Sequence, residues 1–208
     1  MRPLNRDFYL RDTLTVAAEL LGKYLVREVD GTCLIGRITE TEAYIGAIDK
    51  ACHAYGGRIT PRTETLFEQA GTAYVYLIYG MYHCMNVVTE PKGTAAAVLL
   101  RGVEFVRGME SASRLRYGLP LHALSKLQQK NFANGPGKLC KAMGITRDMN
   151  KQDLCDGAFF ITDEVAGIPN PVFKIDTSPR IGIDYAEEAK DFLWRFVIED
   201  RIKKSKLP

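Results

Sequence analysis

Two carboxylates, a tyrosine and a histidine lie close enough in the chain to form an acid–base set. Glu40, Glu42 and Tyr44 belong to the segment 36–44, which reads as a strand, so that period-two alternation puts the three side chains on one face. His53 follows nine residues after Tyr44. Groups of this kind can donate and accept protons near neutral pH when a fold brings them together. They are therefore the first candidates for catalysis.

Four of the ten tyrosines fall within nine residues around one glycine. The strand-forming residues on both sides predict a β-hairpin over about 73–89, with Tyr79 and Met81 at or near its turn. Alternation places Tyr74 and Tyr76 on one face of the hairpin. An exposed aromatic tip suggests a device that inserts into a partner, and paired rings behind it suggest a pocket for a flat ligand. An aromatic-rich core hairpin would produce the same pattern.

The elements that must position these side chains lack the regular strand–helix–strand order of a parallel sheet. Capping residues at 12–15 predict a helix that runs through 16–25. Further helices are expected at 109–116 and 138–143, and a mobile loop or a short irregular helix at 117–133. Strands are expected near 24–29, 33–44, 94–105, 158–162, 172–176 and 193–198. The sequence predicts one α+β domain over residues 1–208, with a curved antiparallel or mixed sheet, surrounding helices and a protruding β-hairpin.

Composition narrows the class of protein. A length of 208 residues with 46% hydrophobic and 25% charged residues is typical of one globular domain with its own core. No apolar run approaches the length of a membrane span, and the first residues lack the apolar stretch of a signal peptide. We therefore expect a cytoplasmic protein, associated with the nucleoid if the source is bacterial. The net charge of +3 permits nucleic-acid binding without demanding it.

The five cysteines argue against a disulfide framework, because their number is odd, they are widely spread, and no Cys-x-x-Cys occurs. Two Cys–His neighbours, 52–53 and 83–84, could suggest a metal site. If these pairs lie on strands, their adjacent side chains point to opposite faces and cannot hold one ion together. We expect no metal and no cofactor.

Five motifs occur in order: Glu-Thr-Glu-Ala-Tyr at 40–44, Gly-Gly-Arg-x-Thr-Pro-Arg at 56–62, Tyr-Val-Tyr-x-Ile-Tyr-Gly-Met-Tyr at 74–82, Val-Leu-Leu-Arg at 98–101, and Asn-Gly-Pro-Gly-Lys-Leu-Cys at 134–140. With these motifs the chain resembles the alkyladenine (3-methyladenine) DNA glycosylase family, the type with an aromatic β-hairpin. The resemblance extends from about Leu4 to about Phe196. It implies a monomeric base-excision-repair enzyme that acts on double-stranded DNA containing damaged purines. Such an enzyme flips the base and hydrolyses the N-glycosidic bond of alkylated purines and hypoxanthine.

The resemblance also implies a division of catalytic roles. Glu42 matches the general base that activates water, and Glu40 is the alternative on the same strand face. Arg101 matches an arginine that positions the water, and it could equally be a buried ion-pair partner of Glu42. The backbone carbonyl of Ile181 is expected to be the other anchor for the water. Because no motif lysine lies where a Schiff base to the sugar would form, we expect simple hydrolysis without strand cleavage.

The flipped base is expected to lie between aromatic side chains. Tyr79 matches the wedge that fills the vacated stack, with Met81 beside it. Asn86 matches an amide that excludes guanine by crowding its 2-amino group, although an asparagine at a strand end often only binds backbone. The matching pocket residues are Tyr44, His53, Tyr76 and Asn86, and the role of Tyr74 stays open.

The segment 134–138 has two interpretations. Glycines and a proline at a helix start leave backbone N–H groups free to face a DNA phosphate, and Lys138 adds a charge. A tight turn before a capped helix would have the same sequence. Arg58 and Arg62, in the second motif, are further candidates for phosphate contacts.

Some parts of the chain depart from the family pattern. His83 stands where the family often has an apolar aromatic residue, the segment 117–133 matches poorly, and 184–191 is only loosely similar. These departures concern substrate range and DNA contacts. Two other functions compete with the leading one: a non-catalytic damaged-DNA binding protein that flips and holds bases, and a hydrolase of free nucleosides.

Overall fold

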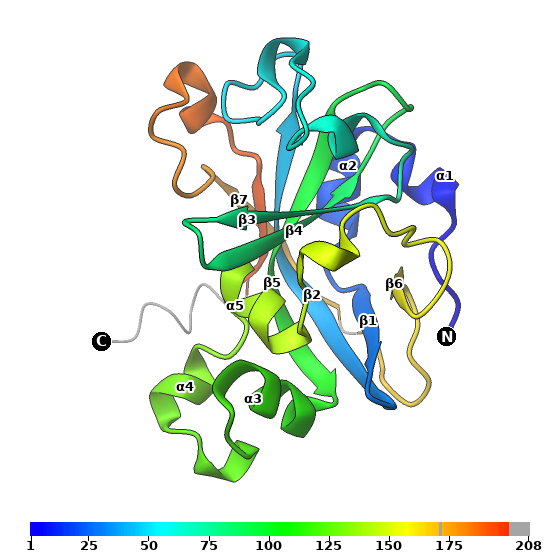
Figure 1. Ribbon diagram of the computed structural model, residues 1–208, viewed down its shortest axis with the longest axis vertical. Helices are drawn as coiled ribbons and strands as arrows, with labels where there is room; N and C mark the ends of the chain where they lie inside the picture. The colour runs from blue at the N-terminus through cyan, green and yellow to red at the C-terminus, as the bar shows by residue number, and fades with distance from the viewer. Residues whose placement is uncertain (171, 200–208) are drawn as a thin grey trace.

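A curved antiparallel sheet organises the chain (Figure 1). The computed structural model describes residues 1–170 and 172–199. Within these residues the strand order is β3-β4-β5-β2-β1-β6, while β8 pairs with β2 and β7 pairs with β8. The eight strands are β1 (Tyr24–Val29), β2 (Thr32–Ile45), β3 (Ala73–Ile78), β4 (Tyr82–Val88), β5 (Ala96–Arg107), β6 (Phe159–Thr162), β7 (Ile175–Ser178) and β8 (Arg195–Ile198). The predicted α+β class with an antiparallel sheet is confirmed.

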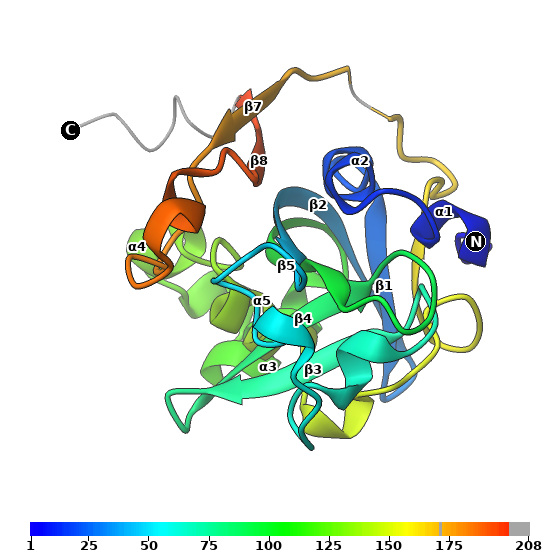
Figure 2. The ribbon, with the colours of Figure 1, turned by 90° about the horizontal axis from the view of Figure 1, so that it is seen from above.

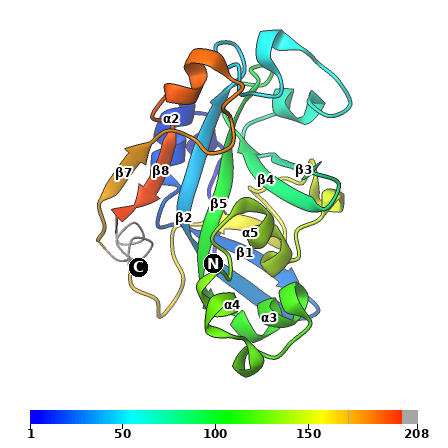
Figure 3. The same cartoon turned by 90° about the vertical axis from the view of Figure 1, so that its left-hand side faces the viewer.

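The long strand β2 changes partners along its length. Its first half pairs with β1, and its residues Glu40 to Glu42 pair with β8 on that same edge while β5 continues on the other. The register with β5 shifts on both sides of Glu40, as at a β-bulge, which bends a strand and increases its twist. Figure 3 shows β7 and β8 alongside β2 at this place. The two candidate carboxylates therefore lie where the sheet bends.

Helices cover the sheet and join its strands. Helix α2 packs on β2, α5 packs on β4 and β5, and α3 packs on α5. The five α-helices in the described residues are α1 (Arg6–Tyr9), α2 (Thr13–Glu19), α3 (Met109–Tyr117), α4 (Lys126–Lys130) and α5 (Pro136–Met143). Short 3-10 turns are η1 (Tyr55–Gly57), η2 (Glu64–Phe67), η3 (Leu121–Ala123), η4 (Arg147–Met149) and η5 (Glu187–Asp191). None of these helices has the length and apolar character needed to span a bilayer.

The first long helix is shorter than its sequence predicts. Asp12 caps it as expected, but the helix ends at Glu19. Gly22 has φ +83°, a left-handed conformation that suits glycine, and its N–H donates to the Ile38 carbonyl of β2. Leu25, the last residue of the predicted helix, is buried in β1 instead. The prediction of a helix through 16–25 was wrong because a leucine at helical spacing fits a buried strand equally well.

The predicted hairpin is confirmed, and it projects from the body of the molecule (Figure 2). Ile78 pairs with Tyr82, so that Tyr79, Gly80 and Met81 form the turn. Tyr79 has φ +52° and Gly80 has φ +68°. The Tyr79 side chain is 81% exposed, which excludes a core position for it.

Other predicted boundaries differ in detail. The segment 117–133 contains η3 and α4, and the Ser125 side chain caps α4 in a reciprocal capping box with Gln128. Of the two alternatives for this segment, the structure has the short helices rather than a loop throughout. The strand expected near 172–176 begins at Ile175. The basic tail at 203–206 lies outside the described residues.

Candidate active site

A cavity of about 600 Å³ lies between the hairpin, the centre of the sheet and the start of α5. Its walls are largely aromatic and apolar with a few polar groups, the usual character of a small-molecule site. The wall residues that matter for the chemistry are Tyr44, His53, Tyr74, Tyr76, Asn86, Arg101 and Ile181 at one end, and Tyr82, Arg116, Lys138 and Lys141 at the other. Tyr79 extends one rim. The structure thus brings most of the predicted site residues to one place.

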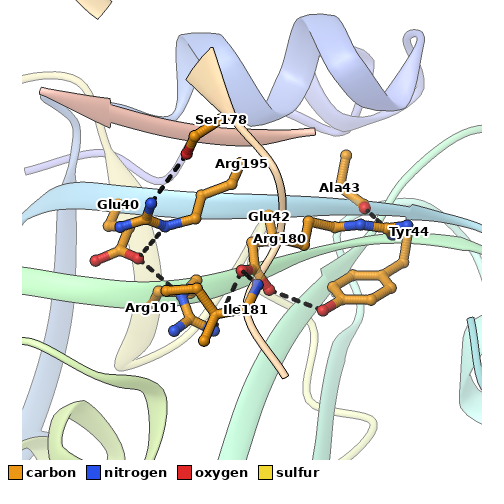
Figure 4. A network of polar contacts seen from close by, with 9 residues as sticks. All are labelled: Glu40, Glu42, Ala43, Tyr44, Arg101, Ser178, Arg180, Ile181 and Arg195. Carbon is orange, nitrogen blue, oxygen red and sulfur yellow. Dashed lines mark hydrogen bonds and ion pairs between the residues drawn. The ribbon is translucent and has the colours of Figure 1, made fainter. Parts of the chain in front are cut away.

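Glu42 is completely buried directly behind this wall (Figure 4). Its Oε2 accepts a 2.7 Å hydrogen bond from the Tyr44 hydroxyl, and its Oε1 accepts a 2.9 Å bond from the Ile181 N–H. Arg101 Nη1 lies 3.3 Å from Oε1. Burial and the charge of Glu42 raise the pKa of Tyr44 well above its ordinary value, so the phenol stays protonated and donates. Every group that contacts the Glu42 carboxylate here also lines the cavity.

Glu40 lies in a different environment. Its Oε1 accepts from Arg101 Nε at 2.8 Å and from Arg195 Nε at 2.7 Å, and Arg195 also donates to Ser178 Oγ. Burial raises the pKa of Glu40, but the two arginines more than offset burial, so the pKa is lowered overall. Glu40 is thus bound to two guanidinium groups. One of them, Arg195, belongs to β8 and also binds Ser178 of β7. The geometry favours Glu42 over Glu40 as the carboxylate nearest the cavity.

Arg101 combines the two interpretations proposed for it. It lines the cavity, and it also forms ion pairs with Glu40 and Glu42. Burial by itself lowers its pKa, and the two carboxylates raise it overall, so that the guanidinium remains charged. The buried ion pair is present, and a contact with water stays a prediction.

Three rings form the aromatic end of the cavity. The centroids of His53 and Tyr76 are 4.7 Å apart with planes at 78°, and those of Tyr74 and Tyr76 are 5.1 Å apart with planes at 31°. His53 Nδ1 lies 3.0 Å from the Tyr74 hydroxyl, so Tyr74, whose role was open, supports the histidine. Desolvation and the neighbouring Arg62 lower the pKa of His53 to about 4. His53 is therefore neutral near pH 7.

Asn86 is buried at the same end. Its Nδ2 donates to the Tyr74 carbonyl at 3.2 Å, so the amide does bind backbone, although Asn86 lies within β4 rather than at its end. The residue also lines the cavity. Selection of the base by Asn86 stays a prediction.

The opposite end of the cavity is basic. Pro136 is the first residue of α5 and Gly135 its N-cap, so the Gly-Pro-Gly segment begins a helix as predicted. Lys138 Nζ donates to Oδ1 of Asn131 and of Asn134, each at 3.1 Å. Burial and the nearby Arg116 lower the pKa of Lys138. This lysine is held in place by neutral partners rather than by a carboxylate.

Arg58 and Arg62 lie on one loop between Cys52 and Thr63. The Arg62 guanidinium lies 5.2 Å from the centre of the Tyr76 ring and 3.4 Å from His53 Nε2, at the edge of the aromatic end. Arg58 is exposed, and its backbone carbonyl accepts a hydrogen bond from Thr63. Met81 is 61% exposed beside Tyr79 at the hairpin tip.

Only one of the two Cys–His neighbours lies on a strand. His83 and Cys84 do lie on β4, but Cys52 and His53 lie in turns rather than on a strand, so strand alternation does not apply to them. No group of three or more His, Cys, Asp or Glu side chains in the described part of the chain is arranged to hold a metal ion.

Sequence reasoning missed Arg180, Asp49 and Arg195. Arg180 and Asp49 form a salt bridge in which both side chains are fully buried, and Arg195 joins β8 to Glu40. Arginine and aspartate are usually exposed, so a single chain gives no signal that these two are in the core. The cue that was available is position, since Arg180 directly precedes Ile181.

Comparisons with known proteins identify the family of the chain. The family model described as methylpurine-DNA glycosylase matches residues 7–202. Relatives from Clostridium perfringens, Clostridium tetani and Alkaliphilus oremlandii are each 56% identical to the chain, over 95% of its length and 96% of theirs. These relatives carry the provisional name 3-methyladenine DNA glycosylase. The chain belongs to the methylpurine-DNA glycosylase family, as its motifs predicted.

Proposed function

We propose that this protein is a monofunctional DNA glycosylase acting in base excision repair. It hydrolyses the N-glycosidic bond of alkylated purines and hypoxanthine in double-stranded DNA, and residues 1–208 act as one catalytic domain in a monomer. The observation that carries the proposal is the position of Glu42. A fully buried carboxylate lies behind an aromatic cavity and contacts three residues of its wall.

Access to a base in duplex DNA requires flipping, for which the hairpin is suited. The exposed Tyr79 ring enters the gap in the stack, with Met81 next to it. The extruded purine stacks on Tyr44, Tyr76 and His53. A neutral His53 does not repel the positive charge of an N-alkylated purine, and the electron-rich tyrosine rings attract it.

Hydrolysis then proceeds at the anomeric carbon of the flipped nucleotide. A water oxygen bonds to C1′ as the bond to the base nitrogen breaks, and the water proton passes to Glu42. The negative Glu42 also stabilises the positive charge that develops on the sugar. Arg101 and the backbone carbonyl of Ile181 hold the water. Asn86 excludes guanine by crowding its 2-amino group.

Hydrolysis without strand cleavage is supported by where the lysines lie. Among the cavity-lining residues in the described part of the chain, the lysines are Lys138 and Lys141, and both belong to the α5 end. A Schiff base to the sugar would need a lysine at the Glu42 end. Lys138, with Arg58 and Arg62, binds DNA phosphates instead.

One assay separates this proposal from its competitors. A labelled duplex with a single hypoxanthine is incubated with the protein and then cleaved with alkali at any abasic site. A glycosylase gives a cleaved strand, whereas a non-catalytic binding protein gives a complex and no cleavage. A nucleoside hydrolase leaves the duplex intact and acts on free inosine. A panel of lesions in the same assay ranks 3-methyladenine, 7-methylguanine, hypoxanthine and ethenoadenine.

A further inference from the structure

Arg180 connects three separate segments at the catalytic end of the cavity. Its Nη1 and Nη2 bind both oxygens of Asp49, at 2.5 and 2.7 Å. Nη1 also donates to the Ala43 carbonyl of β2 at 2.8 Å, and Nη2 donates to the Ala189 carbonyl at 3.1 Å. Asp49 belongs to the loop that leads to His53, and Ala43 lies between Glu42 and Tyr44.

The guanidinium also lies over two aromatic rings. Its Cζ is 4.6 Å from the centre of the Tyr44 ring and 5.1 Å from that of Trp194. Both members of the Asp49–Arg180 pair are fully buried, while Arg180 Nε has no hydrogen-bond partner within the described residues. A buried ion pair with one donor left unsatisfied adds little net stability. Stability alone is therefore a weak account of this arrangement.

Arg180 contacts the chain on both sides of the groups that bind Glu42: it donates to the carbonyl of Ala43, next to Glu42, and it directly precedes Ile181 (Figure 4). Ile181, the next residue in the chain, donates its N–H to Glu42 Oε1. Tyr44, which donates to Glu42 Oε2, has its ring under the guanidinium. Both neutral hydrogen bonds to the Glu42 carboxylate thus come from groups that Arg180 holds.

We propose that the buried Asp49–Arg180 pair is a positioning device for Glu42: it sets the Ile181 N–H and the Tyr44 hydroxyl that orient the carboxylate toward the cavity. This inference rests on the proposed function for its catalytic consequence, but its structural part stands independently of activity. Neither residue touches the substrate, and both act through Ile181 and Tyr44.

The variants must avoid an unpaired buried charge, which would itself unfold the protein. The double variant Arg180→Met with Asp49→Asn removes both charges together. Arg180→Lys keeps the charge pair but cannot bind Asp49 and the Ala43 carbonyl in one flat fork. The control is Arg6→Met with Asp153→Asn, in a partly exposed pair of the same two residue types. Arg6 also pairs with an aspartate and donates to a backbone carbonyl, and it lies in α1 on the side of the molecule away from the hairpin tip (Figure 1).

Three measurements test the proposal on protein that is folded by circular dichroism. Single-turnover excision of hypoxanthine should fall about 10- to 100-fold in the double variant, because small displacements of a catalytic group have large effects on rate. Arg180→Lys should recover part of this loss. The affinity for an ethenoadenine duplex, followed by fluorescence, should change less than about fivefold, since the other pocket walls and the wedge remain. Amide hydrogen exchange of Ile181 should accelerate at least tenfold, whereas the control variant should change none of the three.

Two results would contradict the proposal. Unchanged excision with unchanged Ile181 exchange would make the pair purely structural. Equal losses of excision and binding would mean that it shapes the base pocket rather than Glu42. If the wild-type protein does not excise hypoxanthine, the proposed function fails, and Ile181 exchange alone then decides whether Arg180 holds the Glu42 contacts.

Discussion

Tyr44 donates a 2.7 Å hydrogen bond to Glu42, although only Ala43 separates them along β2. Alternation puts both side chains on one face of the strand, and at this point the strand lies against the cavity. A pocket wall and a candidate base are therefore directly connected. The proposed stacking of a purine on Tyr44 would place its glycosidic bond near the carboxylate.

The first prediction concerns Glu42→Gln. Glutamine is nearly the same size, and its amide can still accept from the Ile181 N–H while its nitrogen faces the Tyr44 hydroxyl, so the cavity should persist. Loss of a general base should reduce single-turnover excision on the order of 10²- to 10⁴-fold. Binding to a hypoxanthine duplex should stay nearly unchanged in a gel-shift titration.

Glu40→Gln is the control for this prediction, because Glu40 shares Arg101 but binds two arginines. It should reduce excision less than Glu42→Gln does. If Glu42→Gln excises within threefold of the wild-type rate while Glu40→Gln does not, the base is Glu40.

The second prediction concerns Lys138 at the basic end of the cavity. Its ammonium is held by two asparagine oxygens, so its position is set before DNA arrives. Lys138→Ala should weaken damaged and undamaged duplex alike, and should lower the slope of log K against log salt by about 0.9. Lys23→Ala is the control, because Lys23 lies over the Phe8 ring beside α1. If the salt slope is unchanged in Lys138→Ala, the Gly-Pro-Gly-Lys segment only starts the helix and does not bind phosphate.

The third prediction concerns the charge state of His53. Arg62 contributes to a pKa of about 4, so Arg62→Gln should move that pKa back toward 6.5, as measured by NMR titration of the imidazole in DNA-free protein. Arg58→Gln should leave it unchanged, because Arg58 is not among the groups that shift it. If the pKa of His53 does not change in Arg62→Gln, desolvation alone lowers it.

The same shift has a consequence for stability. Because the pKa of His53 is lower in the folded state than the ordinary 6.5, the unfolded chain binds more protons between pH 6.5 and 4. The contribution of His53 to the free energy of unfolding is thus fully present above about pH 6.5, and it is lost as the pH falls toward 4. The side chain is partly exposed, so this loss is small.

The sequence predicted the local features of the fold, but it did not predict contacts between residues that are far apart in the chain. The hairpin and two helices carry their own signals. These are alternation in the hairpin, a proline in the first turn of α5, and a glycine at the end of both α3 and α5. The boundary between α2 and β1 was misplaced because Gly22 turns toward Ile38, a partner sixteen residues away. Periodicity contains no information about such a partner.

The same distinction applies to the site. Glu42 and Tyr44 are neighbours on one strand, so their contact follows from alternation. The partners of Arg180 are 137 and 131 residues away in the chain, at Ala43 and Asp49. Only the assembled fold brings them together. From the family resemblance, Ile181 was expected to anchor the water through its carbonyl. Its N–H bond to the Glu42 carboxylate was not expected.

The last prediction concerns Tyr79 as the wedge. This tyrosine has a left-handed backbone at φ +52°, which costs about 1–2 kcal/mol for a residue with a side chain, and its ring is 81% exposed. An unfavourable backbone and an exposed apolar ring are both costs in the free protein, so a benefit is expected when a partner binds. Aromatic stacking in the vacated space is worth roughly 1–3 kcal/mol, and Tyr79→Ala should destabilise the flipped complex by that amount.

Ethenoadenine fluorescence, which responds to unstacking, measures the flipped fraction directly. Tyr79→Phe should flip like the wild type, because the ring rather than the hydroxyl fills the gap. The melting temperature of Tyr79→Ala should stay within about 2 °C of the wild type, since an exposed ring contributes little to the core. If Tyr79→Ala does not lower the flipped fraction, the wedge is Met81, the other exposed side chain of the turn. In that case Met81→Ala should lower the flipped fraction. Because Tyr79 is not in the core, a loss of flipping at unchanged stability has one physical source: the ring is missing from the DNA stack.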